Sequence, residues 1–214
     1  MTKITRIGTE NDYTCDCSKT IKLLSENEII LRNTLNKFNA LTDTEFSEFL
    51  TVCEYRGFLK KEYLLKSGNH NHGIYFVISG AVGLFELIDG KEMYQNFFLE
   101  YEFANELKSL TTQTPSTKNL IALVDTTCFH LSRKELLKLY EKSVSFERLG
   151  RKLLEHVLSG QNEISCVLQS LKPEERYKYL ENKRPKLLNT IPLTYLASYL
   201  GLVRETLSRI RSKK

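Results

Sequence analysis

Several hallmarks of membrane, secreted and catalytic proteins are missing from this sequence. No apolar run approaches the roughly 20 residues that span a bilayer, and the N-terminus lacks the apolar core of a signal peptide. Neither a nucleophile elbow, a P-loop, an HExxH zinc motif nor a paired-carboxylate signature occurs. We therefore expect a cytoplasmic protein that has no membrane partner and is not an enzyme, with no catalytic residues and no metal site.

The cysteines of this sequence are irregularly spaced. The five cysteines are Cys15, Cys17, Cys53, Cys128 and Cys166. An odd number at irregular spacing argues against a disulfide framework and fits a reducing compartment.

The chain has 214 residues, a length that fits one large or two small domains. Its charged residues are distributed unevenly along the sequence. The net charge is +5, but the segment from Lys172 onward carries +7 and the remainder carries −2. The apolar fraction of 41% and the charged fraction of 27% are ordinary for a globular chain. A near-neutral body with a basic C-terminal quarter fits a protein whose end contacts nucleic acid.

The segment 191–214 predicts two short helices joined by a tight turn at Gly201, where a residue that tolerates positive φ is needed. The apolar positions expected to be buried are Leu193, Leu196, Ala197 and Leu200 in the first helix, and Leu202, Val203, Leu207 and Ile210 in the second. The opposite face of the second helix is polar and basic. This pattern is typical of a helix-turn-helix, whose second helix enters the DNA major groove.

The polar face of the second helix carries the predicted DNA contacts. They are Arg204, Glu205, Thr206, Ser208, Arg209 and Lys213. Arginine pairs with guanine O6 and N7, and glutamate accepts from cytosine N4, so these residue types suit base readout. Ser208 and Lys213 are placed to contact phosphates. The alternative is a solvated basic helix that has no partner.

The phrase LASYLGLVRETLSRIR resembles the helix-turn-helix of the Crp/Fnr family of bacterial transcription regulators, especially a short-tailed branch ending close to iASyLGitpetLSRIRkk. The resemblance implies that Arg204, Glu205 and Arg209 contact bases. Many relatives of this branch have proline where this chain has Arg204, which leaves the operator sequence open.

Residues from Tyr55 onward form short runs rich in aromatic and β-branched residues, separated by glycines. Asp89-Gly90 between two such runs predicts a hairpin, and strands at about ten-residue spacing predict an antiparallel sandwich or jelly roll. The phrase KKEYLLKSGNHNHGIYFVISGAVGLFELIDGKE resembles the cyclic-nucleotide-binding β-roll of the same family, and the resemblance extends over about 35–140.

Nucleotide-binding relatives carry a phosphate cassette made of a Gly-Glu pair, small residues and an arginine. Glu106 is the candidate for the cassette acid, but no arginine occurs between Gly57 and His130, and Pro115 stands where it is needed. Because a bidentate arginine suits a buried phosphate, we expect that cyclic AMP is not bound. No other cofactor is predicted, and the remaining ligand-binding residues are unknown.

A long helix is predicted over 142–171 from an apolar stripe of heptad spacing. In the family this helix forms the dimer interface. The residues expected there are Leu153, Val157, Ile164, Val167, Leu168 and Leu171. The alternative is a core helix that packs within one chain.

Some members of the family hold an iron–sulfur cluster through N-terminal cysteines, which raises Cys15 and Cys17 as candidate ligands. Such clusters take four ligands, typically at C-x2-C spacing, and this pair is closer. Reduced thiols are the favoured interpretation, and a redox or iron–sulfur sensor is an alternative that an iron-free anaerobic preparation would exclude.

The sequence thus predicts an α+β protein with an N-terminal antiparallel β-roll, a long dimerisation helix and a C-terminal helix-turn-helix. The predicted units are a variable leader (1–34), a cyclic-nucleotide-binding-like roll (35–141), the dimerisation helix (142–171) and the DNA-binding domain (172–214). The predicted function is a dimeric, sequence-specific transcription regulator of double-stranded DNA, with a pseudo-palindromic operator and RNA polymerase as a further candidate partner. A small-ligand or cyclic-nucleotide sensing module is the main alternative.

Overall fold

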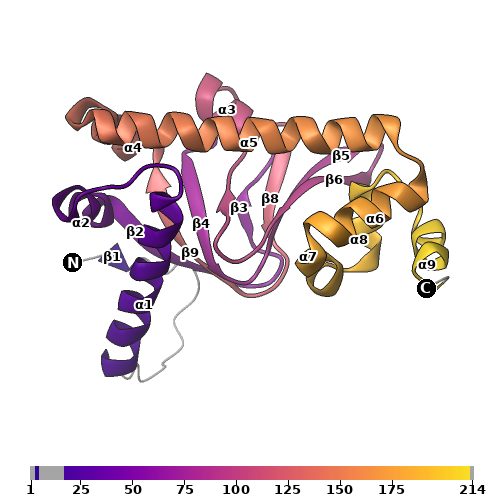
Figure 1. Ribbon diagram of the computed structural model, residues 1–214, viewed down its shortest axis with the longest axis horizontal. Helices are drawn as coiled ribbons and strands as arrows, with labels where there is room; N and C mark the ends of the chain where they lie inside the picture. Colours follow the sequence, from indigo (N-terminus) through magenta and orange to yellow (C-terminus); the bar gives the residue numbers. More distant parts are fainter. Residues whose placement is uncertain (1–2, 5–16, 213–214) are drawn as a thin grey trace.

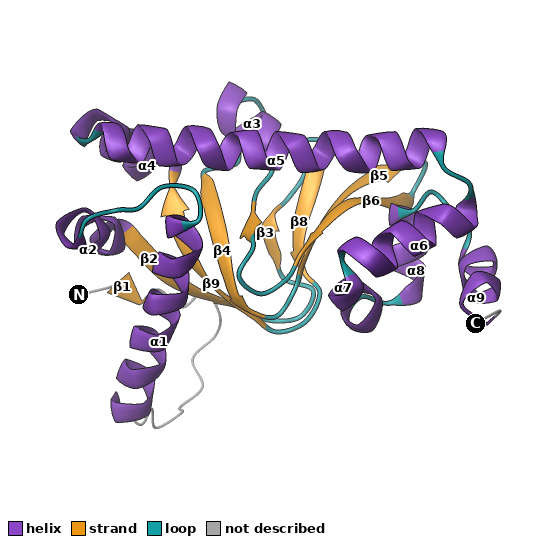
Figure 2. Cartoon of the chain, viewed as in Figure 1, coloured by secondary structure: helices purple, strands orange, loops and turns teal. Residues whose placement is uncertain are grey.

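The computed structural model describes residues 3–4 and 17–212, and the side chains of residues 26–212. Figures 1 and 2 present the elements in chain order. The strands are β1 (Lys3–Ile4), β2 (Cys53–Phe58), β3 (Tyr63–Leu65), β4 (Gly73–Ser79), β5 (Val82–Ile88), β6 (Lys91–Phe98), β7 (Phe103–Ala104), β8 (Lys118–Ala122) and β9 (Thr126–Ser132). The helices are α1 (Cys17–Asn36), α2 (Asp43–Val52), α3 (Leu107–Thr112), α4 (Arg133–Lys142), α5 (Val144–Ser170), α6 (Pro173–Lys183), α7 (Pro185–Thr190), α8 (Leu193–Tyr199) and α9 (Arg204–Ser212).

The strands form a roll of two sheets, with orders β1-β2-β9-β4-β7 and β3-β8-β5-β6. All strand pairs are antiparallel except β1 with β2. The predicted hairpin is confirmed, because β5 pairs with β6 across Asp89 and Gly90, whose φ angles are +51° and +75°. The roll interior is packed with aliphatic and aromatic side chains, among them Val77, Leu120 and Phe98.

Helices cover the outer face of the five-stranded sheet (Figure 1). The side chains packed there include Leu31, Leu35, Phe46, Phe76, Phe129, Leu139 and Phe146. Alternation along β4 and β9 explains this arrangement, since successive side chains point to opposite faces of a strand. The predicted boundary at residue 34 lies inside α1, so the described part of the leader is continuous with the core of the roll.

A capping box begins α2. Thr42 Oγ1 accepts from the backbone N–H of Glu45 at 3.2 Å, and Glu45 Oε2 accepts from the backbone N–H of Thr42 at 2.9 Å. Glu45 also accepts from the Ser143 hydroxyl at 2.7 Å, which joins α2 to the start of α5. The Thr42 N–H and then the Ser143 hydroxyl lower the pKa of Glu45 to about 2.

The predicted long helix is α5, which runs along the top of the view in Figure 1 and leads into the C-terminal helices. Pro173 cannot continue α5, which ends at Ser170, and it occupies the first turn of α6. The C-terminal helices lie beneath the end of α5 and pack against β6. Within 3–4 and 17–212, no helix has the length and apolarity needed to cross a bilayer.

Candidate nucleic-acid interface

The turn between α8 and α9 has the hydrogen bonds of a Schellman motif. Gly201 has φ +64°, its N–H donates to Ser198 O at 3.1 Å, and the Leu202 N–H donates to Ala197 O at 2.9 Å. A left-handed residue at this point ends α8 and reverses the chain. The glycine at the predicted turn therefore sets the angle between the two helices.

Arg176 of α6 connects this turn to the end of α5. Its Nε donates to Leu171 O at 2.9 Å, and its Nη1 donates to Leu200 O at 3.0 Å. One guanidinium thus joins the C-cap residue of α5 to the C-cap residue of α8. This side chain is thus a direct polar link between the end of α5 and the helix-turn-helix.

The two faces of α9 differ sharply. Leu207 and Ile210 are buried at 0% and 8% exposure against α6 and α8. The predicted DNA contacts Arg204, Glu205, Ser208 and Arg209 are exposed, Thr206 is half-buried, and Lys213 lies outside the described residues. Neither Arg204 nor Arg209 forms an ion pair or side-chain hydrogen bond with another described residue. Two free guanidinium groups therefore project from an anchored helix.

One expectation for the helix-turn-helix is wrong. Val203, predicted to be buried, is 65% exposed. It lies in the turn before α9 begins at Arg204, where helical spacing does not apply.

The DNA-binding end is docked on the roll through α8. Ser198 Oγ accepts from the backbone N–H of Tyr94 at 3.0 Å and donates to Glu92 O at 2.8 Å. Tyr195 stacks on Tyr94 with ring centroids 4.6 Å apart. These contacts join segments about 100 residues apart in sequence, and no sequence pattern indicated them.

Arg184, between α6 and α7, makes a second bridge to the roll. Its Nη2 lies 2.7 Å from Glu102 Oε2 and donates to Phe97 O at 3.0 Å, while Nη1 donates to Asn96 Oδ1 at 3.2 Å. Such a fork of donors holds a guanidinium in one orientation. The position of the helix-turn-helix relative to the roll therefore depends on a polar clamp as well as on apolar packing.

The cassette residue Glu106 is buried and is the N-cap of α3. Its carboxylate accepts from the backbone N–H groups of Lys108 at 3.1 Å and Ser109 at 2.8 Å. Buried Asn71 donates from Nδ2 to Glu106 O at 2.9 Å, and the Ser109 hydroxyl accepts from the Asn71 N–H at 2.9 Å. The N-terminus of α3 is thus occupied by the protein's own carboxylate, where an anionic ligand would compete with it.

The residues predicted for the dimer interface face mainly the chain's own body. Leu153 and Val157 line a pocket against the roll, and Ile164 packs on the cluster that joins the roll to the C-terminal helices. Val167 is buried, and Leu168 and Leu171 are half-buried. The exposed apolar side chains of α5 include Leu154 (37%) and Leu158 (44%), on the flank of that stripe.

Three cysteines have described side chains. Cys53 and Cys128 are buried, and burial raises the pKa of each thiol to about 12, whereas Cys166 is exposed. Cys15 lies outside the described residues, and of Cys17 only the backbone is described. Where side chains are described, no three His, Cys, Asp or Glu residues are grouped to hold a metal ion.

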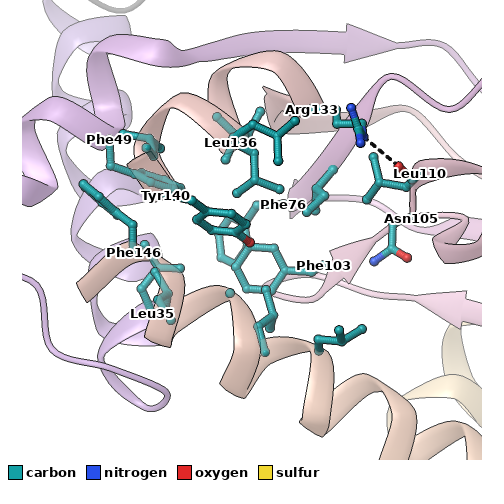
Figure 3. Close-up of a pocket in the computed structure, with 18 of the residues that line it drawn as sticks. Leu35, Phe49, Phe76, Phe103, Asn105, Leu110, Arg133, Leu136, Tyr140 and Phe146 are labelled. Carbon is teal, nitrogen blue, oxygen red and sulfur yellow. Dashed lines mark hydrogen bonds between the residues drawn. The ribbon is translucent and has the colours of Figure 1, made fainter. Parts of the chain in front are cut away.

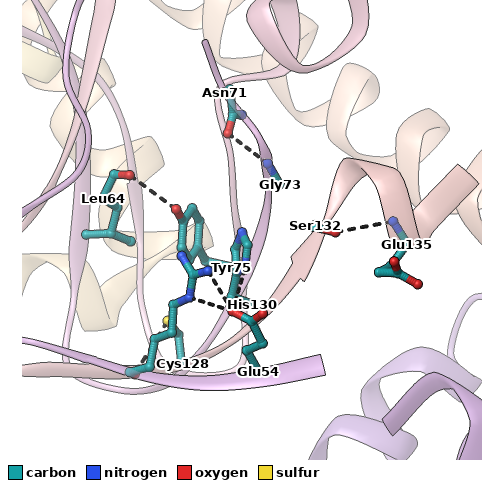
Figure 4. A network of polar contacts seen from close by, with 10 residues as sticks. Glu54, Leu64, Asn71, Gly73, Tyr75, Cys128, His130, Ser132 and Glu135 are labelled. Carbon is teal, nitrogen blue, oxygen red and sulfur yellow. Dashed lines mark hydrogen bonds and ion pairs between the residues drawn. The ribbon is translucent and has the colours of Figure 1, made fainter. Parts of the chain in front are cut away.

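A polar network lies at one end of the roll (Figure 4). Arg56 pairs with Glu54 at 2.6 Å, and Glu54 Oε2 lies 3.7 Å from Nδ1 of buried His130. Burial and then the nearby Arg56 lower the pKa of His130 to about 4, so the ring is neutral at pH 7. Because His130 is neutral, the charges in this network are those of Arg56 and Glu54, which cancel as in a structural ion pair.

A matched pair of Gly→Ala substitutions tests the turn. We expect Gly201→Ala to destabilise the fold by about 1 kcal/mol or more, because φ is +64° and the new Cβ would meet Arg176 Nη1 at 3.3 Å. Gly160→Ala, in the middle of α5 with open space around it, should stabilise by up to about 1 kcal/mol. Urea unfolding of both variants measures the signs, and two changes of equal sign would contradict this account of the turn.

Comparison with known proteins gives the family of the roll and the fold of the chain. The Cyclic nucleotide-binding domain family matches residues 55–143. The structure of FixK2 from Bradyrhizobium japonicum superposes with a TM-score of 0.67 at 22% identity, covering 76% of this chain and 84% of that one. The catabolite activator protein of Thermus thermophilus superposes with a TM-score of 0.54 at 24% identity, covering 84% of this chain and 85% of that one. The c-di-GMP responsive global regulator CLP of Xanthomonas campestris superposes with a TM-score of 0.60 at 20% identity, covering 80% of this chain and 91% of that one.

A curated relative matches over a smaller part of its length. Protein penguin of Drosophila melanogaster is 28% identical over 150 residues, covering 62% of this chain and 19% of that protein. The chain thus spans about a fifth of that relative, which carries no argument about function. The three solved structures share the fold of most of this chain. Residues 55–143 thus match the model of a cyclic nucleotide-binding domain, and the chain has the fold that it shares with these solved structures.

Proposed function

We propose that this protein is a sequence-specific DNA-binding transcription regulator that acts as a dimer. The observation that carries the proposal is the face of α9, where Arg204 and Arg209 are exposed and free of partners while Leu207 and Ile210 anchor the opposite side. A helix held in this way can enter a major groove and present arginines to guanine edges. The +7 charge of the C-terminal quarter supports attraction to phosphates.

The proposed dimer interface runs along α5. Three of its predicted members, Leu153, Val157 and Ile164, pack toward the chain's own body. The contact with a second protomer would therefore extend over the flank at Leu154 and Leu158. These two side chains are apolar and solvent-exposed in one chain, and a helix–helix seam would bury them. A dimer with two-fold symmetry would read a pseudo-palindromic operator.

The proposed mechanism is allosteric and acts through the junction between roll and helix-turn-helix. Arg176 links α5 to the turn before α9, and Arg184 and Ser198 hold the C-terminal helices to the roll. An effector or partner that binds one arrangement of this junction more tightly would shift the spacing of the two recognition helices. RNA polymerase is a candidate partner of the assembled regulator.

We expect no binding of cyclic AMP. The N-terminus of α3 is already capped by Glu106, and Pro115 occupies the position where the cassette requires arginine. Isothermal titration of the whole chain with cyclic AMP should give only heats of dilution. A saturable isotherm with one site per chain would instead favour the ligand-sensing module as the primary function.

The experiment that tests the regulator proposal is selection of DNA sites from a random pool by the purified protein at near-physiological salt. Enrichment of a two-fold palindrome supports a sequence-specific dimer that needs no added effector. The same selection with Leu207→Asp, which puts a charge in the buried side of α9, provides the control and should enrich nothing. Equal enrichment by both proteins would overturn the role of α9.

A further inference from the structure

An apolar pocket lies on the outer face of the five-stranded sheet, between the sheet and helices α4 and α5 (Figure 3). Its volume is about 570 Å³, within the range of small-molecule sites. The lining includes Phe76, Phe103, Phe129, Leu131, Leu153 and Val157. The roll interior lies on the other face of this sheet and is filled by side chains, so the pocket is separate from it.

One end of the pocket is polar. Asn105 is only 9% exposed, yet its side-chain amide makes no hydrogen bond with any described residue. Arg133 lies at the same end (Figure 3), where its Nε donates to Leu110 O at 3.0 Å and its two Nη atoms have no described partner. Both side chains line the pocket with free N–H donors, so a ligand there could accept hydrogen bonds from the amide and the guanidinium.

The charge around this end favours an anion. Arg133 also lines a second hollow of about 530 Å³, together with Lys134, Lys138 and Glu141, and Lys138 is paired with Glu135 at 2.7 Å. The apolar pocket itself is lined by Arg133, Arg151 and Glu147 as its charged residues, and Arg151 is paired with Glu155 at 2.6 Å. Glu147 has no described ion-pair partner either, but it lies near Tyr140, which Figure 3 places away from Arg133. At the junction of the two hollows, the unpaired charge is the positive charge of Arg133.

We propose that the pocket binds a carboxylic acid with an alkyl chain, such as a free fatty acid. The chain would fill the apolar cavity between the sheet and α5, and the carboxylate would accept hydrogen bonds from Arg133 Nη and the Asn105 amide. Arginine is suited to a carboxylate because its fork of donors matches the two oxygens. An uncharged apolar molecule would fill the cavity but leave both polar groups without a partner, which costs affinity.

The test is isothermal titration of the whole chain with decanoate, below the concentration at which it forms micelles, and with decanol as the uncharged counterpart. Decanoate should bind at one site per chain, more tightly than decanol. Arg133→Gln should weaken decanoate binding by about 10-fold or more, equivalent to about 1.4 kcal/mol, and leave decanol binding unchanged. Arg133→Lys, which keeps the charge, should retain part of the affinity.

Two controls locate the site. Lys186→Gln, an equal loss of charge on exposed α7, should not change binding, and Val157→Phe, which fills the cavity, should weaken both ligands. Unchanged unfolding midpoints establish that these variants are folded. Failure of decanoate to bind, or equal affinities for wild type and Arg133→Gln, would overturn the proposal. Because DNA takes no part in the assay, neither result depends on the proposed regulator function.

Discussion

Arg209→Ala should lower the affinity for a selected DNA site by about 5- to 150-fold, equivalent to about 1–3 kcal/mol. Arg209 is exposed on α9, has no described partner, and lies on a helix whose Leu207 and Ile210 are buried. Its guanidinium is therefore free to pair with a guanine edge without breaking a contact in the protein. The loss should be largest on the preferred sequence and small on a site mutated at one base pair.

Fluorescence anisotropy at several salt concentrations separates base readout from charge. Lys213→Ala, a predicted phosphate contact, should weaken binding to every sequence and reduce the salt slope by about one unit. Arg148→Ala removes the same charge as Arg209→Ala from an exposed position on α5 and should leave sequence preference intact. If Arg209→Ala and Lys213→Ala produced the same pattern, the assignment of Arg209 to a base would be wrong.

The features that the sequence predicts well are those fixed by neighbours in the chain. Gly201 follows an apolar helical stripe and adopts the left-handed conformation of a Schellman turn. Asp89 and Gly90 are the two positive-φ residues that a two-residue hairpin requires. In both places the local residue types allow few other backbone conformations. The turn at Gly201 and the strand register of the hairpin can therefore be predicted from the sequence.

Contacts between distant segments were not predictable in this way. An apolar stripe such as that of Leu153, Val157 and Ile164 indicates that one face of α5 is covered, but the period is the same whether the cover is a second protomer or the chain's own roll. The structure turns this face toward the roll. The ion pair between Arg184 and Glu102 could not be predicted from the sequence, because a charged residue in a polar segment belongs to no periodic pattern that would indicate its partner.

The cassette illustrates a residue type retained in a different role. Glu106 was a candidate for ligand binding because of its place in the sequence, and its burial is consistent with an internal role. Its two hydrogen bonds to the start of α3 depend on the backbone conformation, which the sequence alone did not reveal. The absence of an arginine between Gly57 and His130 is the sequence feature that predicts the loss of the phosphate site.

Phe97→Ala should reduce the free energy of unfolding by about 3–5 kcal/mol. Phe97 is fully buried where the roll meets the C-terminal helices, with its ring 5.1 Å from Tyr94 on the roll and 5.4 Å from Tyr199 on α8. Alanine leaves a cavity between the two units, while the Phe97 carbonyl that accepts from Arg184 is retained. The variant therefore isolates the apolar part of the junction from its polar clamp.

Urea unfolding followed by circular dichroism measures this loss. Leu87→Ala, at a side chain that is 58% exposed on the adjacent strand β5, is the control and should change stability by no more than about 0.5 kcal/mol. A loss near 4 kcal/mol in a single transition means that the DNA-binding helices and the roll unfold together, so the junction is strong enough to transmit a shift from one to the other. A loss below about 1 kcal/mol would mean that the helices are not packed on the roll in solution, and the route for allosteric coupling would then be limited to α5 and Arg176.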